Sequence, residues 1–265
     1  MKLPRIWPQY AQGAQKQALS EWFLSPLGQE LLSAEQQLLD HILPDLFGYH
    51  ALQLGQVVPC HLLRESRILH RFVADKQLVL VQGLSALQTL PHQLPLASQS
   101  VDVVVIHHLL EVTHSPHALL REAARVVIPE GHILIVGFNP WSLWGLWRFC
   151  RMPWTTTGWL TQALSAQRLH DWLSLLGFEM LGVETSYFRP PVTANPLRQH
   201  LLWLETLGRR YWPHGGASYV ILAQKKSSCL TPIRLRPQIR ALMPAGLATE
   251  SRKEYQQNQT PPVEE

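Results

Sequence analysis

The stretch LPLASQSVDVVVIHHLLEVTHSPHALLREAARVVIPEGHILIVGFNP, residues 94–140, decides the fold. Residues 101–106 form a β-branched run without polar alternation, which indicates a strand buried on both faces. Ser115 and Pro116 mark a helix start, with serine as the N-cap and proline at the first helical position. Residues 129–131 end that helix, and residues 132–138 read as a second buried strand. Strand, helix and strand in this order form a βαβ unit, which implies a parallel sheet.

A parallel sheet of this kind binds ligands beyond the carboxyl ends of its strands. His107 and His108 follow the first strand of the unit, and Asn139 and Pro140 follow the second. We therefore expect these four residues to lie near any site.

The same patterns extend toward the N-terminus. Residues 31–42 carry apolar side chains at helical spacing, and the helix that they predict is preceded by Pro26 and Gly28. Residues 49–55 read as a strand that ends on glycine. Further strands are predicted at 68–74 and 78–81.

Toward the C-terminus a tryptophan-rich insertion at about 141–160 precedes a helix capped by Ser165 and stopped by Gly177. Strands are predicted at 178–188 and 219–224. We therefore divide the chain into an N-terminal arm (1–25), one α/β domain (26–226) and a disordered tail (227–265).

Composition supports a soluble protein with a large core. Hydrophobic residues make up 46% and charged residues 16%, and the formal net charge is +4. From Lys225 onward seven basic and four acidic residues supply +3 of it, so this tail is either simply solvated or contacts nucleic acid or an anionic surface. Three scattered cysteines suit a reducing compartment, and the N-terminus has no secretory pattern, so we expect a cytoplasmic protein without a transmembrane segment.

The block 94–140 resembles the second half of the type 11 branch of class I S-adenosylmethionine-dependent methyltransferases. The elements in register, in chain order, are Leu94-Pro95, Asp102, Leu110-Glu111, Ser115-Pro116, Leu120-Arg121-Glu122, Arg125-Val126 and Pro129-Glu130-Gly131.

The chain is more specifically similar to an uncharacterised bacterial subgroup of that branch, marked by a GFNP-S-WG segment. Residues 137–145, GFNPWSLWG, match that mark, and Pro26-Leu27-Gly28 and residues 171–179 match two others. The resemblance covers about residues 22–226. It implies a Rossmann-like methyltransferase fold, with helices on both faces of a mostly parallel seven-stranded sheet whose last strand is antiparallel.

The resemblance also implies S-adenosylmethionine as cofactor. The family has a G-x-G-x-G loop after the first strand, where this chain keeps only Gly55, and an acidic residue after the second strand, where Asp75 is the candidate. Such an acid accepts hydrogen bonds from both ribose hydroxyls. The residues expected to bind the cofactor are Leu54, Gly55, Gln56, Asp75, Gln82, Leu96 and His107.

Four histidines, at 107, 108, 114 and 117, crowd into eleven residues. We predict no metal site there, because neighbouring strand residues point to opposite faces and no cysteine or paired carboxylate completes a zinc-like set. His107 and His108 are the candidates for a catalytic proton acceptor.

Asn139, Trp141 and Trp144 are expected on the acceptor side. The tryptophan-rich segment either holds an apolar or aromatic substrate, binds a membrane surface together with Arg148 and Arg151, or caps the core. The leading hypothesis is a methyltransferase enzyme with an unknown acceptor. The alternative, motivated by the single glycine, is a catalytically inactive binding protein of the same fold.

Overall fold

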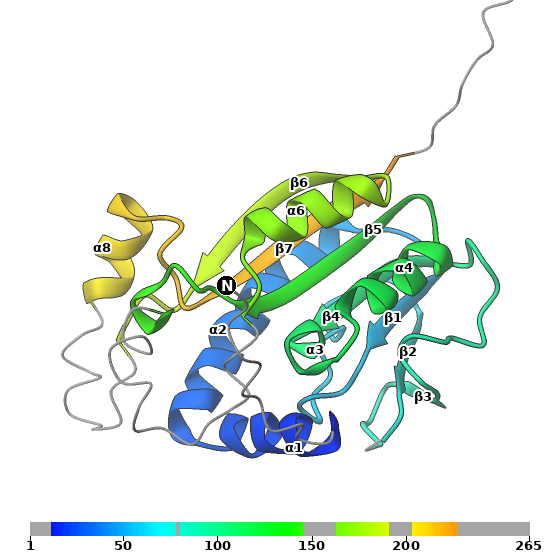
Figure 1. Ribbon diagram of the computed structural model, residues 1–265, viewed down its shortest axis with the longest axis horizontal. Helices are drawn as coiled ribbons and strands as arrows, with labels where there is room; N and C mark the ends of the chain where they lie inside the picture. The colour runs from blue at the N-terminus through cyan, green and yellow to red at the C-terminus, as the bar shows by residue number, and fades with distance from the viewer. Residues whose placement is uncertain (1–11, 78–79, 146–162, 191–202, 227–265) are drawn as a thin grey trace, which may run out of the picture. The chain divides into compact units, whose positions relative to one another are not determined.

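One seven-stranded sheet organises the chain, in the order β3-β2-β1-β4-β5-β7-β6 (Figure 1). The computed structural model describes residues 12–77, 80–145, 163–190 and 203–226. The strands are β1 (His50–Leu54), β2 (His70–Asp75), β3 (Ser85–Gln88), β4 (Val101–His107), β5 (Val127–Phe138), β6 (Phe178–Ser186) and β7 (Ser218–Lys225). The strands from β3 to β5 pair in parallel, whereas β7 pairs antiparallel with both β5 and β6. The predicted fold, including its antiparallel last strand, is confirmed.

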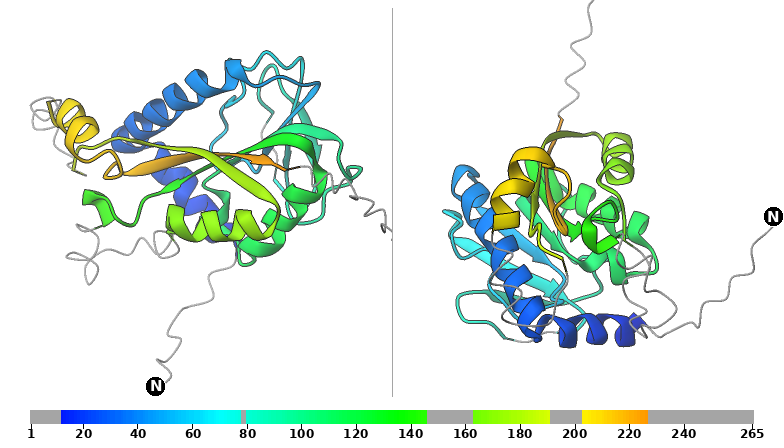
Figure 2. Two further views of the ribbon diagram at one scale, coloured as in Figure 1. Left: turned by 90° about the horizontal axis from the view of Figure 1, so that it is seen from above. Right: turned by 90° about the vertical axis from the view of Figure 1, so that its left-hand side faces the viewer.

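Helices cover both faces of this sheet, with α2 on one face and α4 and α6 on the other (Figure 2). The helices are α1 (Gln12–Phe23), α2 (Pro26–Ile42), the 3-10 turn η1 (Leu43–Asp45), α3 (Leu109–Val112), α4 (Pro116–Val126), α6 (Ala166–Leu175) and α8 (Trp203–Tyr211). Alternate residues of β4 pack on opposite faces of the sheet. Val103 and Val105 pack with Leu39 of α2, and Val104 and Ile106 belong to the core that contains α4.

The predicted βαβ unit is present as β4, α4 and β5. The helix ends earlier than expected, because β5 begins directly after it at Val127 and includes the predicted turn, where Glu130 has a φ of 63°.

The N-terminal arm predicted for residues 1–25 is wrong over its second half. Residues 12–23 form α1, in which Leu19 and Phe23 are fully buried. A break at Ser25 separates α1 from α2, and the Ser25 hydroxyl accepts a hydrogen bond from the Gly28 amide at 3.1 Å. A Cβ at Gly28 would lie 2.5 Å from the Trp22 carbonyl oxygen, so the two helices meet this closely only with glycine.

The third strand also differs from its prediction at 78–81. The chain turns at Gly83, which has a φ of 84°, and β3 starts two residues later. Residues 78–79 lie outside the described residues, and Leu80 and Val81 belong to no strand.

The chain divides after Ser227, and every described residue lies in the first unit. The core of the tryptophan-rich segment, at 146–162, and the tail at 227–265 lie outside the described residues. None of the described helices has the length and apolar character that a membrane crossing requires.

Candidate functional site

Gly55 directly follows β1, has a φ of 82°, and donates its amide to the Ala74 carbonyl at 2.8 Å. A Cβ at this position would lie 2.5 Å from a methyl carbon of Leu109. Glycine is therefore required here both by the backbone conformation and by the approach of α3.

The loop after Gly55 packs its apolar side chains into the core. Val57 and Val58 are buried in the same core as Leu54. The side chain of Gln53, on β1, holds the loop by two hydrogen bonds. It donates to the Cys60 carbonyl at 3.3 Å and accepts from the Leu62 amide at 3.2 Å. The loop is thus held by core packing and one buried amide side chain, in place of further glycines.

Asp75 is the last residue of β2 and is 2% exposed. Its Oδ1 accepts the Lys76 amide at 2.6 Å. Its Oδ2 accepts the Gln56 amide and the Lys16 ammonium group, the latter at 2.5 Å. The carboxylate therefore joins the end of β2 to the turn after β1 and to α1.

A pocket of about 100 Å³ opens beside this carboxylate. Its lining residues come from α1, from the ends of β2 and β3, and from α3: Lys16, Asp75, Lys76, Gln77, Leu90, Pro91, His92, Leu109, Val112 and Thr113. Pockets for whole drug-sized ligands span about 300–1,000 Å³. With Lys16 in place, this pocket therefore has room for only part of such a ligand.

Of the seven residues expected to bind the cofactor, Asp75 lines this pocket, and Leu54, Gly55 and Gln56 lie at the adjacent end of β1. Gln82 was expected to bind the cofactor as a residue that follows the third strand. That premise is wrong, because Gln82 precedes β3. The residues that do follow β3 and line the pocket are Leu90, Pro91 and His92.

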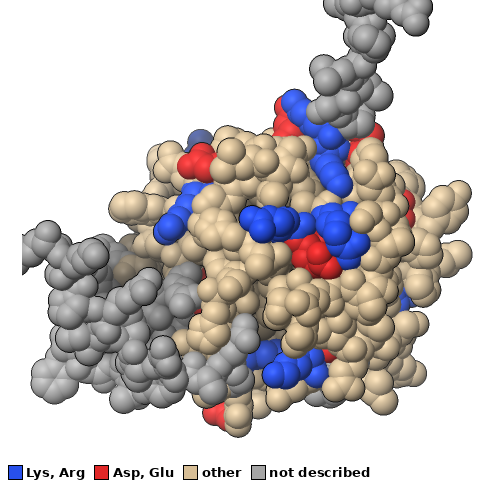
Figure 3. Space-filling model, turned by 45° about the vertical axis from the view of Figure 1, so that its right-hand side comes forward, with Lys and Arg blue, Asp and Glu red and all other residues tan. Residues whose placement is uncertain are grey.

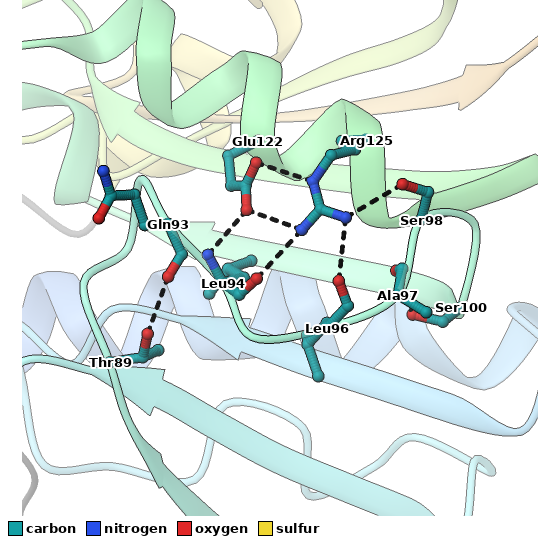
Figure 4. A network of polar contacts seen from close by, with 9 residues as sticks. All are labelled: Thr89, Gln93, Leu94, Leu96, Ala97, Ser98, Ser100, Glu122 and Arg125. Carbon is teal, nitrogen blue, oxygen red and sulfur yellow. Dashed lines mark hydrogen bonds and ion pairs between the residues drawn. The ribbon is translucent and has the colours of Figure 1, made fainter.

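Leu96 belongs to a segment that is fastened to α4 (Figure 4). The Arg125 guanidinium donates to the carbonyl oxygens of Leu94 and Leu96 at 3.1 and 2.9 Å, and Glu122 accepts the Leu94 amide at 2.7 Å. Glu122 and Arg125 also pair with each other at 2.8 Å, and this pairing lowers the pKa of Glu122. The backbone of Leu96 is thus positioned by α4.

His107 and His108 meet two buried carboxylates at the end of β4. Glu35 of α2 accepts one hydrogen bond from each ring, at 3.0 Å from His107 Nε2 and 3.0 Å from His108 Nε2. Glu111 of α3 lies 2.8 Å from His108 Nδ1 and accepts the Phe138 amide at 2.5 Å. At most 4% of any of the four side chains is exposed.

The expectation that the two histidines point to opposite faces is wrong. His108 has left the strand, with a left-handed φ of 49°, and so both rings turn toward Glu35. Burial lowers the pKa of His107. Burial also acts to lower the pKa of His108, but the carboxylates of Glu35 and Glu111 outweigh it and raise that pKa.

Sequence patterns missed Glu35 and the contribution of α1. Glu35 stands in the apolar stripe of α2 between Leu31 and Leu39, and a carboxylate in such a stripe was the signal available. Phe23 of α1 covers both histidine rings, at centroid distances of 5.6 and 5.3 Å.

Asn139 and Trp141, which were expected on the acceptor side, line a second pocket of about 500 Å³ between β6, α6 and the end of β5. Asn139 fixes this corner by donating to the carbonyl oxygens of His214 and Gly216, at 2.7 and 2.9 Å. Trp144 instead packs against Trp22 and Tyr187. The described lining is uncharged apart from histidine: Asn139, Trp141, Ser165, Ala166, Gln167, His170, Met180, Val183, Thr185, His214 and Tyr219.

Known proteins share this architecture. The family model described as methyltransferase domain matches residues 51–135. A solved S-adenosylmethionine-dependent methyltransferase from Thermotoga maritima has a TM-score of 0.57 at 18% identity, over 78% of this chain and 93% of that one. One from Archaeoglobus fulgidus has a TM-score of 0.50 at 20% identity, over 72% and 93%. At these identities the two structures define the fold alone.

Sequence similarity to one known protein covers more of the chain than the domain match does. The chain is 32% identical over 169 residues to the uncharacterised protein YafS of Escherichia coli, over 64% of this chain and 69% of YafS. With the domain match and the fold, this places the chain: it belongs to the class I S-adenosylmethionine-dependent methyltransferase family.

Proposed function

We propose that this protein is an S-adenosylmethionine-dependent methyltransferase that binds its cofactor across the ends of β1 and β2. The observation that carries the proposal is the position of Gly55 and Asp75 at the carboxyl ends of two adjacent parallel strands. The left-handed backbone of Gly55 turns the chain beside the end of β2, and the buried carboxylate of Asp75 can accept two hydroxyl groups.

The residues around Asp75 fit an adenosine group. Leu90, Pro91, Leu109 and Val112 give the pocket apolar walls, and Asp75 is its acidic residue. Because the Asp75 carboxylate is now bound by Lys16, ribose binding requires this ammonium group to move or to share the oxygen.

The bound cofactor would supply an electrophilic methyl group for in-line transfer to a nucleophile. The chain's own contribution is to position the acceptor and exclude water. We assign acceptor binding to the uncharged pocket lined by Asn139 and Trp141. His107 and His108 lie behind Phe23, so a role as proton acceptor would require α1 to move.

The second candidate function is a binding protein of the same fold without turnover. It is favoured by the loop after Gly55, where Val57 and Val58 are buried in the core. The two candidates differ in whether S-adenosylmethionine binds at Asp75.

Calorimetric titration of the full chain with S-adenosylmethionine and S-adenosylhomocysteine tests the proposal. We expect binding that weakens about 10-fold or more in Asp75→Asn, since two charge-assisted hydrogen bonds are lost. Asp171→Asn is the matched control, because that carboxylate is 74% exposed on α6. Absence of binding at millimolar ligand, in folded protein, would leave the binding-protein function as the better account.

A further inference from the structure

The cluster of Glu35, His107, His108 and Glu111 has the composition and arrangement of a metal centre. Ligand atoms of Glu35, His107 and His108 all lie within 4.8 Å of one another. We propose that these three side chains bind one divalent transition-metal ion of the zinc class, and that Glu111 is a positioning residue for His108. This site is independent of the proposed cofactor site.

The distances within the cluster suit coordination. Both histidine Nε2 atoms point at the oxygens of a single carboxylate, each at 3.0 Å. Two ligands that bind one ion at about 2.1 Å, with an angle of roughly 90–110° between them, stand about 3.0–3.4 Å apart. A metal could therefore replace the protons on these two nitrogen atoms with little movement of the side chains.

Glu111 holds His108 in the orientation that coordination needs. Its Oε2 lies 2.8 Å from His108 Nδ1, which leaves Nε2 directed at Glu35. Its other oxygen is fixed by the backbone amide of Phe138. Metal-binding histidines almost always donate their second ring nitrogen to a carboxylate or carbonyl in this way, which sets the tautomer.

Charge balance also favours a dication. Throughout the described residues, the hydrogen-bond and ion-pair partners of these four side chains are one another and the Phe138 amide. Two buried carboxylates carry a formal charge of −2, which a divalent ion bound by two imidazoles would cancel once the proton on His108 is released.

The donor set and its surroundings identify the class of ion. Two imidazoles and a carboxylate suit zinc, cobalt or nickel, whereas magnesium and calcium favour all-oxygen sites. The rings of Phe23 and Phe138 enclose the cluster, with Phe138 4.2 Å from the His108 ring. An ion held here would tie α2 to the end of β4 and to α3, so we expect it to stabilise the fold.

The test is a titration of the full, tag-free chain with Co²⁺ after removal of bound metal by a chelator. We expect one equivalent to bind with visible absorption bands, and His107→Gln and Glu35→Gln to abolish them. His50→Gln is the matched control, because His50 and His70 form an exposed pair, with 2.8 Å between their Nδ1 atoms, that could hold surface metal. Glu111→Gln should weaken binding about 10- to 100-fold while leaving the ligands in place.

Lack of stoichiometric uptake, or uptake lost in His50→Gln and kept in His107→Gln, would overturn the proposal. If the cluster variants fail to fold, the melting temperature of the unaltered chain decides. It should rise with Co²⁺ or Zn²⁺ and fall again on chelation, and a melting temperature that does not respond counts against the site.

Discussion

At the end of β1, Gly55 combines a left-handed backbone with a contact that leaves no room for a side chain. Its φ is 82°, and a Cβ there would meet Leu109 at 2.5 Å. Gly177, with a φ of 83° and open space around it, has the same backbone conformation without the contact. The two glycines therefore separate backbone strain from steric exclusion.

We expect Gly55→Ala to lower the free energy of unfolding by about 2–4 kcal/mol, because left-handed strain and overpacking against α3 add. Gly177→Ala should cost only the strain, about 1 kcal/mol. Urea denaturation of both variants measures the difference. Equal losses would show that Leu109 yields without cost and that contact with α3 does not restrict this position.

Single residues in the candidate site were predictable where the family pattern places a chemical group after a strand. Gly55 ends one predicted strand and Asp75 follows the next, and the two residues lie at the ends of adjacent strands of the sheet. The residues around His107 were not predictable in the same way, since His108 reverses direction by a left-handed backbone that no local pattern marks. Glu35 lies 72 residues before its partner His107 in the sequence, so only the tertiary fold brings the two side chains together.

At the level of secondary structure, α4 anchors the segment before β4. Arg125 and Glu122 bind three backbone groups of Leu94 and Leu96, and Arg125 also donates to the Ser98 hydroxyl (Figure 4). These two side chains are three residues apart on a helix, a spacing that allows them to pair. Their bonds to the segment arise from tertiary structure, so helical spacing alone could not reveal them.

Arg125→Ala should lower the free energy of unfolding by roughly 1–3 kcal/mol, since hydrogen bonds from a charged group to backbone carbonyls are lost. Arg121→Ala is the control: it removes the same charge from the same helix at a position exposed to solvent, and should cost less than about 0.5 kcal/mol. Chemical denaturation compares them. Similar losses in both variants would mean that the network contributes nothing beyond the charge of the helix.

Helix α1 lies across the carboxyl ends of β2 and β4, through Lys16 at Asp75 and Phe23 at the two histidines. Residues 12–23 were predicted to be part of an arm, since their apolar side chains have only a weak helical periodicity. The helix competes with the proposed cofactor for one carboxylate.

Lys16→Met should therefore tighten binding of S-adenosylhomocysteine, by about three- to tenfold if the lost ion pair is worth that of a partly buried pair. Lys76→Met is the control, because Lys76 lines the same pocket but contacts Asp75 through its backbone amide. Calorimetry gives both dissociation constants. Weaker binding in Lys16→Met would identify the lysine as a cofactor ligand and contradict competition.

On the scale of the whole molecule, the parallel half of the sheet was predictable because buried β-branched strands and capped helices have strong local signals. The predicted position of β3 was wrong, since a short exposed edge strand has no such signal and a turn at Gly83 comes just before it. The antiparallel β7 came from the family resemblance, because periodicity does not distinguish strand direction.

The net charge assigned to the tail is smaller once Lys225 and Lys226 are counted with the folded domain. Lys225 ends β7 and donates to the carbonyl oxygens of Ala124 and Val127, and Lys226 pairs with Glu179 at 3.0 Å. Residues 227–265 then hold five basic and four acidic residues, a net charge of +1. On the face drawn in Figure 3, the described lysines and arginines form separate groups between uncharged atoms, some beside acidic residues. These observations give the nucleic-acid hypothesis less support than the sequence alone did.

A crystal structure of the full chain with S-adenosylhomocysteine tests most directly whether the cofactor binds at Asp75. We expect the ribose hydroxyls on the Asp75 carboxylate, the adenine beside Leu90 and Pro91, and the Lys16 ammonium group withdrawn from Asp75. A ligand bound elsewhere, or an intact Lys16–Asp75 pair with no ligand at millimolar concentration, would contradict the claim that this sheet edge binds the cofactor.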